Sequence, residues 1–346
     1  MTPMMQQYFN LKNKVSDSIL FFRMGDFYEI FDKDAELVAP LLGIVLTSRD
    51  KGEDTKIPFC GVPHHSAKNY WSKLIKMGFK IAIADQLETP SEAKGIVKRD
   101  IVKILTPANI DDIDLLDQNT PNYAMSVYEE PQSKDLALCL FDTSTGEIRL
   151  GNILNKEEIK SFCFKYKPKQ ILVRKFFQQE LKNILEDYLT IEKILIEPLP
   201  ESILRDTLQQ EQIIQEVFGS HDLQSFPCGS VNGGKEVLSA TILYLKSLYT
   251  KTEQFLTIKC LQEPNTMILD EIAQRDLELF ESISRHSLKG SLFAQLNYTS
   301  APMGARLLKR WLAHPLLDHN QIIMRHNTIE FLLKIQNPKL ENLKEL

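Results

Sequence analysis

The chain has 346 residues, of which 43% are hydrophobic and 25% charged, and its formal net charge at pH 7 is −5. At roughly 100–200 residues per domain, this length predicts two or three domains. The composition excludes collagen-like and wholly disordered chains, and apolar runs far shorter than the roughly 18 residues of a membrane span exclude a membrane protein. The net charge argues against a uniformly basic nucleic-acid coat.

Residues 1–107 alternate between helical and strand patterns, which predicts a mixed α/β unit. We expect helices over residues 3–13 and 27–42 and around Tyr70–Met77, and strands over residues 19–23, 44–47, 80–85 and 101–105. A loop rich in Lys, Gly and Asp is expected over residues 49–56. The periodicity then breaks at Thr106-Pro107, and the acidic run that follows predicts a linker.

Residues 120–250 predict a second α/β unit. Strands are expected over residues 123–128, 135–142, 147–151 and 170–173, and helices over residues 156–164 and 176–188. Asp142 and the turn Thr143–Gly146 are similar to the first hairpin of ribonuclease H-like folds, whose nucleases gather several carboxylates around two metal ions. No comparable acids end the strand over residues 170–173, so we expect this architecture without nuclease chemistry.

From residue 238 onward the pattern is helical. We expect helices over residues 238–249 and 269–283, a third that begins at Pro302, and a fourth that Asp318 caps. The last helical stretch continues to Leu346 without a stop. We therefore interpret residues 256–346 as the incomplete start of a larger helical architecture.

Two motifs come close to known sites. Residues 229–236 nearly match the phosphate-binding loop G-x-x-x-x-G-K-[ST], but Glu236 replaces the hydroxyl that binds magnesium, so we expect a turn that enters a helix. Cys60 and the pair His64-His65 lack a second cluster of ligands, which argues against zinc. With no nucleophile elbow, H-E-x-x-H motif or dinucleotide fingerprint, the sequence predicts no enzyme and no cofactor in this chain.

Five cysteines are scattered through the chain without a CxxC pair, and no charged-then-apolar leader precedes them. This pattern predicts a reduced, cytoplasmic protein.

The most informative segment is Phe21–Phe31, Phe-Phe-Arg-Met-Gly-Asp-Phe-Tyr-Glu-Ile-Phe. Its pattern predicts an apolar strand that turns through Gly25 into a helix, with one carboxylate two residues after Phe27. From the pattern alone, a buried stripe is the commoner interpretation, because Phe27 and Phe31 are four residues apart and aromatic stripes usually belong to a core.

This segment closely resembles the mismatch-reading motif of the MutS family of DNA mismatch-repair proteins. Further similar segments lie toward both ends of the chain: Thr2–Tyr8, Ile57–His64, Lys103–Pro107, Arg275–Leu279 and Pro302–Leu312. The resemblance implies a mismatch-binding domain over residues 1–107, a ribonuclease H-like connector over residues 120–250 and the start of a helical core and lever domain over residues 256–346.

The resemblance also implies the site and its partners. Phe27 would wedge into the minor groove of kinked DNA and stack on a mispaired base, while Glu29 would hydrogen-bond that base. Met24 and Tyr28 would flank the wedge. Arg49 and Lys103 would contact the DNA backbone, or else be solvated surface charges. The implied partners are duplex DNA with mismatches or small loops and, through the connector, downstream repair proteins.

Family members continue into a clamp and an ATPase that binds ATP and Mg²⁺, and neither is expected in this chain; a homodimer is expected only of full-length members. The alternative function is a non-catalytic scaffold for protein interactions that has lost DNA reading.

Overall fold

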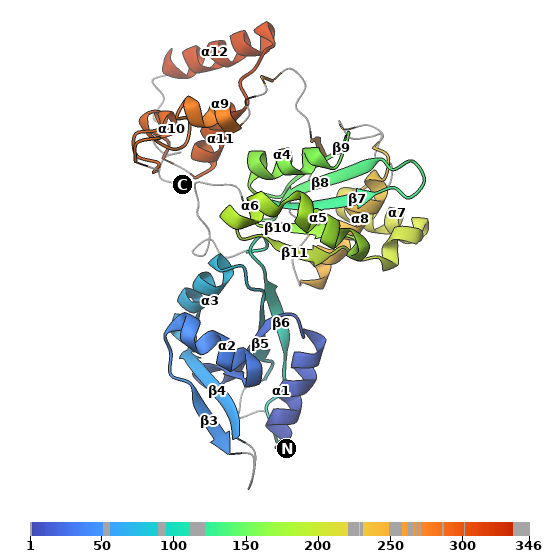
Figure 1. Cartoon of the computed structure of the whole chain (residues 1–346), viewed down its shortest axis with the longest axis vertical. Coiled ribbons are helices and arrows are strands. Elements are labelled where there is room, and N and C mark those ends of the chain that lie inside the picture. The colour runs from blue at the N-terminus through green and yellow to red at the C-terminus, as the bar shows by residue number, and fades with distance from the viewer. Residues whose placement is uncertain are drawn as a thin grey trace.

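The computed structural model contains two mixed α/β units followed by a group of helices (Figure 1). The structure describes residues 2–50, 56–88, 95–110, 122–220, 228, 231–248, 258–261, 266–267, 269, 271–285, 287–300 and 302–334. Within these ranges, none of the helices has the length and apolar character needed to cross a bilayer. The expected mixed α/β fold class is confirmed, with two mixed sheets.

The first unit is built on a six-stranded sheet with the order β3-β4-β2-β1-β5-β6. Strands β1 and β5 are parallel, and all other neighbours in this sheet are antiparallel. The strands are β1 (Ile19–Met24), β2 (Phe27–Phe31), β3 (Thr47–Asp50), β4 (Lys56–Pro63), β5 (Ile81–Gln86) and β6 (Arg99–Leu105).

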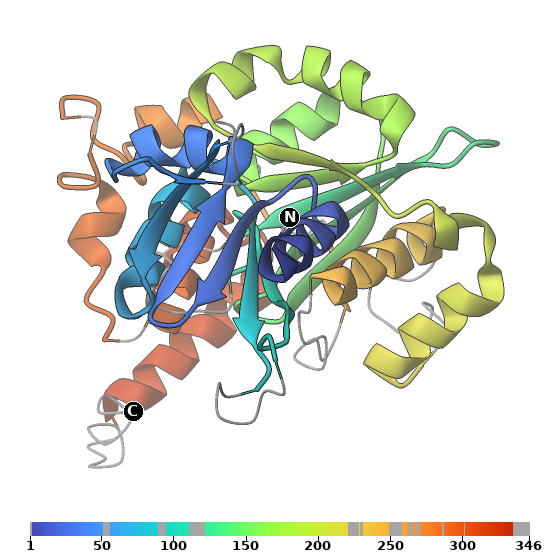
Figure 2. The same ribbon diagram turned by 90° about the horizontal axis from the view of Figure 1, so that it is seen from below.

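Helices cover both faces of this sheet. Helix α1 (Pro3–Lys14) begins at the N-cap Thr2, whose hydroxyl accepts a hydrogen bond from the Met5 N–H at 3.4 Å. It packs through Tyr8 on one face, which we call the α1 face; Figure 2 shows this dark-blue helix beside the blue strands. Helices α2 (Asp32–Leu42) and α3 (Ala67–Lys76) cover the opposite face, which we call the α2–α3 face.

Residues 27–31 form a strand, so the helix expected over residues 27–42 was wrong in its first part. Met24 pairs with Phe27 across a two-residue turn, in which Gly25 has a φ of +60°. A glycine with positive φ at the first turn position is typical of tight hairpins. The spacing of Phe27 and Phe31 could not reveal this, because residues four apart share a face in a strand as well as in a helix.

The following strands also differ from expectation. The strand expected over residues 44–47 begins only at Thr47, and its backbone continues through Arg49 in what was expected to be a loop. Lys56, expected at the end of that loop, begins β4, which pairs with both β2 and β3. Residues 51–55 of the expected loop lie outside the described part of the chain.

The second unit also has a six-stranded sheet, with the order β11-β10-β7-β8-β9-β12. Strands β7 (Ala124–Glu129), β8 (Leu136–Asp142) and β9 (Glu147–Ile153) form the antiparallel meander that the turn at 143–146 predicts. Strands β10 (Gln170–Val173) and β11 (Leu195–Pro198) then add in parallel. The bounds of β10 are those expected from the sequence.

Helices on both faces complete the second unit. One face carries α4 (Glu157–Tyr166), α5 (Gln178–Ile184) and α6 (Glu186–Ile191), the last two replacing the single helix expected over residues 176–188. The other carries α7 (Thr207–Phe218) and α8 (Gly234–Ser247). The purely helical pattern expected from residue 238 was wrong, because β12 (Ile258–Cys260) pairs in parallel with β9.

The described helices at the end are α9 (Glu271–Asp276), α10 (Leu292–Leu296), α11 (Pro302–Ala313) and α12 (His319–Lys334). Helix α9 is shorter than the helix expected over residues 269–283. The N-cap expected at Asp318 is confirmed, since its carboxylate accepts a hydrogen bond from the Gln321 N–H at 2.8 Å. Residues 335–346 of the expected last helix lie outside the described residues.

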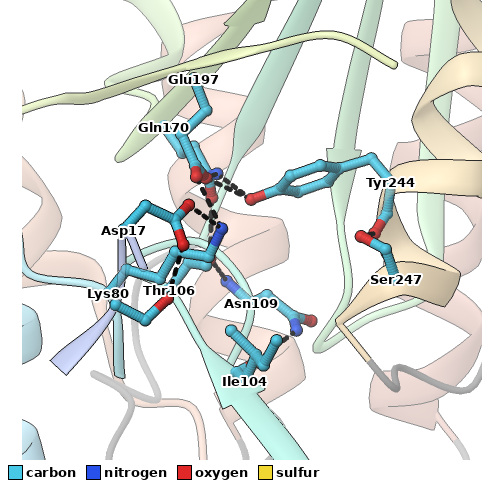
Figure 3. A network of polar contacts seen from close by, with 10 residues as sticks. Asp17, Lys80, Ile104, Thr106, Asn109, Gln170, Glu197, Tyr244 and Ser247 are labelled. Atoms are coloured by element: carbon cyan, nitrogen blue, oxygen red, sulfur yellow. Dashed lines mark hydrogen bonds and ion pairs between the residues drawn. The ribbon is translucent and has the colours of Figure 1, made fainter. Parts of the chain in front are cut away.

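A polar network, buried except for Asp17, joins the two α/β units (Figure 3). Lys80, immediately before β5, donates to Asp17 at 2.9 Å and to Glu197 on β11 at 2.7 Å. On the first unit's side, the Thr106 hydroxyl donates to Gln170 Oε1 at 2.7 Å. Gln170 donates through Nε2 to Glu197 at 2.5 Å, and the Tyr244 hydroxyl donates to the same carboxylate.

Candidate nucleic-acid interface

The α1 face of β2 carries an aromatic and acidic stripe with one covered end and one open end. Phe27, Glu29 and Phe31 alternate on this face because side chains two residues apart in a strand point the same way. Tyr8 of α1 covers Phe31, with ring centroids 4.8 Å apart, and Phe31 is only 1% exposed. Phe27, at the hairpin end, is 47% exposed.

The backbone around Glu29 is fixed by strands on both sides. Glu29 pairs with Phe22 on β1 and with Gly61 on β4. Phe22 is fully buried under α1, while Gly61 presents no side chain. The half-buried Glu29 side chain, whose Oε2 atom is buried, therefore lies between the covered aromatic cluster and the exposed Phe27 ring.

Met24 is the expected flanking residue that the structure brings to Phe27. It ends β1 directly opposite Phe27 and packs, partly buried, against the core on the α1 face. The structure thus places three of the expected residues, Met24, Phe27 and Glu29, on one face at the hairpin end of the sheet.

Tyr28 points to the other face and is not brought to this group. It is 2% exposed, packs on Trp71 of α3, and donates its hydroxyl hydrogen to Asp85 at 3.2 Å. Burial and the neighbouring Asp85 carboxylate raise the pKa of Tyr28 to about 12. Tyr28 therefore holds β2 in place from the α2–α3 face, opposite to Phe27.

The two expected backbone contacts lie apart from Phe27. The backbone of Arg49 pairs with Ile57 at the β3 edge of the sheet. Lys103 on β6, at the opposite edge, pairs with Ile83, which belongs to the core of the α2–α3 face. Directly paired residues share a face, so the side chain of Lys103 leaves the sheet on the face opposite to that of Phe27.

Arg99 is a residue at this site that the sequence analysis missed. From β6 its guanidinium lies 5.0 Å from the Phe22 ring centroid, and it donates to the Arg23 carbonyl at 2.6 Å and to Gln7 at 3.1 Å. Burial lowers the pKa of Arg99, while the Asp85 and Glu29 carboxylates oppose this shift. Arg99 thus brings a positive charge to the region of Glu29. This neighbourhood depends on the strand order β2-β1-β5-β6, which places β6 two strands away from β1 in the sheet.

The remaining motifs have structural roles. Asp142 is buried and accepts hydrogen bonds from the Ser144 N–H at 2.9 Å and the Asn122 N–H at 3.0 Å. In the near-match to a phosphate loop, Lys235 pairs with Glu211 at 2.9 Å, and helix α8 begins at Gly234, as a turn entering a helix predicts. In the described ranges, no three His, Cys, Asp or Glu side chains are grouped so as to hold a metal ion.

Comparison with known proteins identifies three successive matches along the chain. The family models described as MutS domain I, MutS domain II and MutS domain III match residues 2–114, 122–254 and 273–346, respectively. These ranges include the first α/β unit, the second unit except for β12, and nearly all of the helices that follow.

Relatives named DNA mismatch repair protein MutS are similar over nearly the whole chain. The protein from Caldanaerobacter subterraneus subsp. tengcongensis is 37% identical, covering 100% of this chain and 39% of the relative. The protein from Chlorobaculum parvum is 35% identical, covering 99% of this chain and 39% of the relative. The protein from Ruminiclostridium cellulolyticum is 38% identical, covering 96% of this chain and 38% of the relative. The chain spans less than two fifths of the length of these relatives. The resemblance inferred from the motifs is confirmed: the chain belongs to the MutS family.

Proposed function

We propose that this chain recognises mispaired or unpaired bases in duplex DNA as part of mismatch repair, with Phe27 as an aromatic wedge and Glu29 as the group that hydrogen-bonds the displaced base. The observation that carries this proposal is the exposure of Phe27, 47%, at the open end of a stripe whose other aromatic member, Phe31, is 1% exposed. Its relatives' name, DNA mismatch repair protein MutS, supports the same role.

The energetics of a wedge favour defective DNA. Inserting an apolar side chain between base pairs unstacks one step at a cost of a few kcal/mol. That cost is smaller where pairing is already lost or the duplex kinks easily. Phe27, supported by Met24 and held at the end of a hairpin, has the exposure and the rigid backbone that insertion needs. The ease with which the DNA deforms then decides where the protein binds, and many different mismatches meet this requirement.

Glu29 adds discrimination against normal duplex. A carboxylate near phosphates is repelled, and this cost is offset only when it accepts a hydrogen bond from a base N–H that mispairing has freed. In a matched pair those donors are already used. Arg99 moderates the charge of Glu29 from within the protein, so that the carboxylate is tolerated in the folded state before DNA binds.

The other two units fit supporting roles. We propose the boundaries 1–107, 120–250 and 256–346, although β12 extends the second sheet past residue 250. The antiparallel meander β7-β8-β9, followed by parallel β10 and β11, supports a ribonuclease H-like connector that would receive downstream repair proteins. Helices α9 to α12 would begin the helical core. The free cysteines support a cytoplasmic location.

The direct test compares wild type with Phe27→Ala in binding to a duplex with one unpaired thymine and to the matched homoduplex. Fluorescence anisotropy at low salt suits this measurement, because low salt strengthens protein–DNA binding. We expect a preference for the unpaired base in wild type and none in Phe27→Ala. Equal binding of the defective duplex by the two proteins would refute the proposal.

A further inference from the structure

Gly61 lies in the interior of β4, where glycine weakens a strand because it loses more conformational freedom on folding than other residues. A strand glycine often marks a bulge, a bend or a place where a ligand approaches the backbone closely. Gly61 pairs in regular register between Cys60, opposite Ile30, and Val62, opposite Tyr28. The φ angle of Gly61 is also not positive, so its backbone conformation does not require glycine.

The protein itself also has room for a side chain at this position. A Cβ atom on Gly61 would lie 3.5 Å from the Tyr28 carbonyl oxygen, 3.7 Å from Glu29 Cγ and 3.9 Å from Phe27 Cδ1. All three are ordinary van der Waals distances. By contrast, a Cβ on Gly233 would lie 2.8 Å from the Tyr128 ring and one on Gly151 would lie 2.7 Å from Leu261. Packing explains those two glycines but does not explain Gly61.

The location of the missing side chain points to a ligand. The Cβ would project beside both Phe27 and Glu29, the two residues proposed to stack on and hydrogen-bond a base. Tyr8 of α1 covers the neighbouring Phe31, whose ring stacks on the partly buried Phe59 with centroids 5.9 Å apart. Gly61 is thus the position at which the covered part of the sheet gives way to the open part.

We propose that Gly61 is a specificity-determining position whose missing side chain leaves the space between Phe27 and Glu29 for the displaced base. This inference rests on the proposed function. A planar purine or pyrimidine that stacks on Phe27 and presents its hydrogen-bonding edge to Glu29 passes over the backbone of Gly61. A methyl group there displaces the base, and because dispersion is short-ranged, a gap of about 0.5–1 Å already forfeits a quarter to a half of the stacking contact.

The test introduces side chains of increasing size, Gly61→Ala and Gly61→Val, with Ser48→Thr on exposed β3 as a control that adds one methyl group elsewhere on the sheet. Each protein is melted and then titrated with the duplex containing one unpaired thymine and with the homoduplex. We expect melting temperatures no lower than wild type, since alanine and valine suit a strand better than glycine. Binding to the unpaired base should weaken at least about fivefold in Gly61→Ala and further in Gly61→Val, with homoduplex binding unchanged.

Three outcomes overturn the inference, and they are distinguishable. If Gly61→Val keeps the wild-type preference while Phe27→Ala loses it, the base does not pass over Gly61, and the proposed function stands. If Gly61→Ala lowers the melting temperature markedly, the fold itself requires the glycine. If wild type shows no preference for the unpaired base, the proposed function fails and the inference fails with it.

Discussion

Lys80 Nζ lies 2.7 Å from Glu197 Oε1, and this ion pair joins the first sheet to the second across residues 117 apart in the chain. Both side chains are largely buried, 12% and 9% exposed. Burial lowers the pKa of Lys80, but the Glu197 and Asp17 carboxylates outweigh it and raise the pKa above its usual value. With Gln170 and Tyr244 also bonded to Glu197, this network fixes how the proposed reading unit sits on the second unit (Figure 3).

Removing the cation of this pair should destabilise the chain strongly. Lys80→Met leaves the Glu197 carboxylate buried without its countercharge, which typically costs about 3–5 kcal/mol. Urea unfolding followed by tryptophan fluorescence would measure the loss. Lys246→Met breaks an ion pair to Glu216 that is exposed at the surface, and serves as the control with little expected change. Similar small losses in both variants would contradict an ordering role for Lys80.

Truncation of Phe27 and of Phe31 should differ in its effect on the melting temperature. Phe31→Ala opens a cavity beneath Tyr8 and should cost about 3–5 kcal/mol. Phe27→Ala removes a half-exposed ring and should leave the melting temperature nearly unchanged. If Phe27→Ala instead melts as early as Phe31→Ala, the aromatic stripe is core throughout, and the scaffold function is favoured.

Neutralising Glu29 should strengthen binding to normal duplex. Glu29→Gln removes a negative charge that the proposed binding mode brings near the phosphates. This charge is worth about 1 kcal/mol near water, so homoduplex affinity should rise about fivefold at low salt. The preference for an unpaired base should fall correspondingly. Glu36→Gln, at an exposed position of α2 on the opposite face of the sheet, is the charge-matched control. An equal gain in the control would mean that total charge, and not the position of Glu29, governs the affinity.

Glu147 should contribute an acid-sensitive part of the stability. Burial raises its pKa, but Arg149, at 2.7 Å, and Lys259 outweigh that effect, so the folded-state pKa lies below the usual 4.5. A depressed carboxylate pKa stabilises the fold above pH 4.5, and this stabilisation is lost as the pH falls through the folded-state pKa.

Glu147→Gln should accordingly be less stable than wild type at pH 7 and show a flatter loss of stability below pH 4.5. Urea midpoints measured from pH 7 to pH 3 check both points. Parallel pH profiles for the two proteins would show that the carboxylate does not stabilise the fold in its ionised form.

Much of the fold could be predicted because its determinants are local. The strand Gln170–Val173, the β8–β9 hairpin and the Asp318 cap follow from a short apolar run, a turn and a single hydrogen-bonding side chain. The same reasoning failed at Phe27, because a separation of four residues satisfies both a helix and a strand. It failed at β12 because a three-residue strand has meaning only once β9 is available to pair with it.

The sequence by itself determined the family, through motifs near both ends of the chain, and it singled out Phe27, Glu29 and Met24. Tertiary structure decided which candidates lie close together. Tyr28 is buried in the core and Lys103 lies on the opposite face, whereas Gly61 and Arg99 lie near Glu29. The physical reason is that periodicity and turn chemistry act over a few residues. Strand order and register are set by the packing of segments that the chain brings together only when it folds.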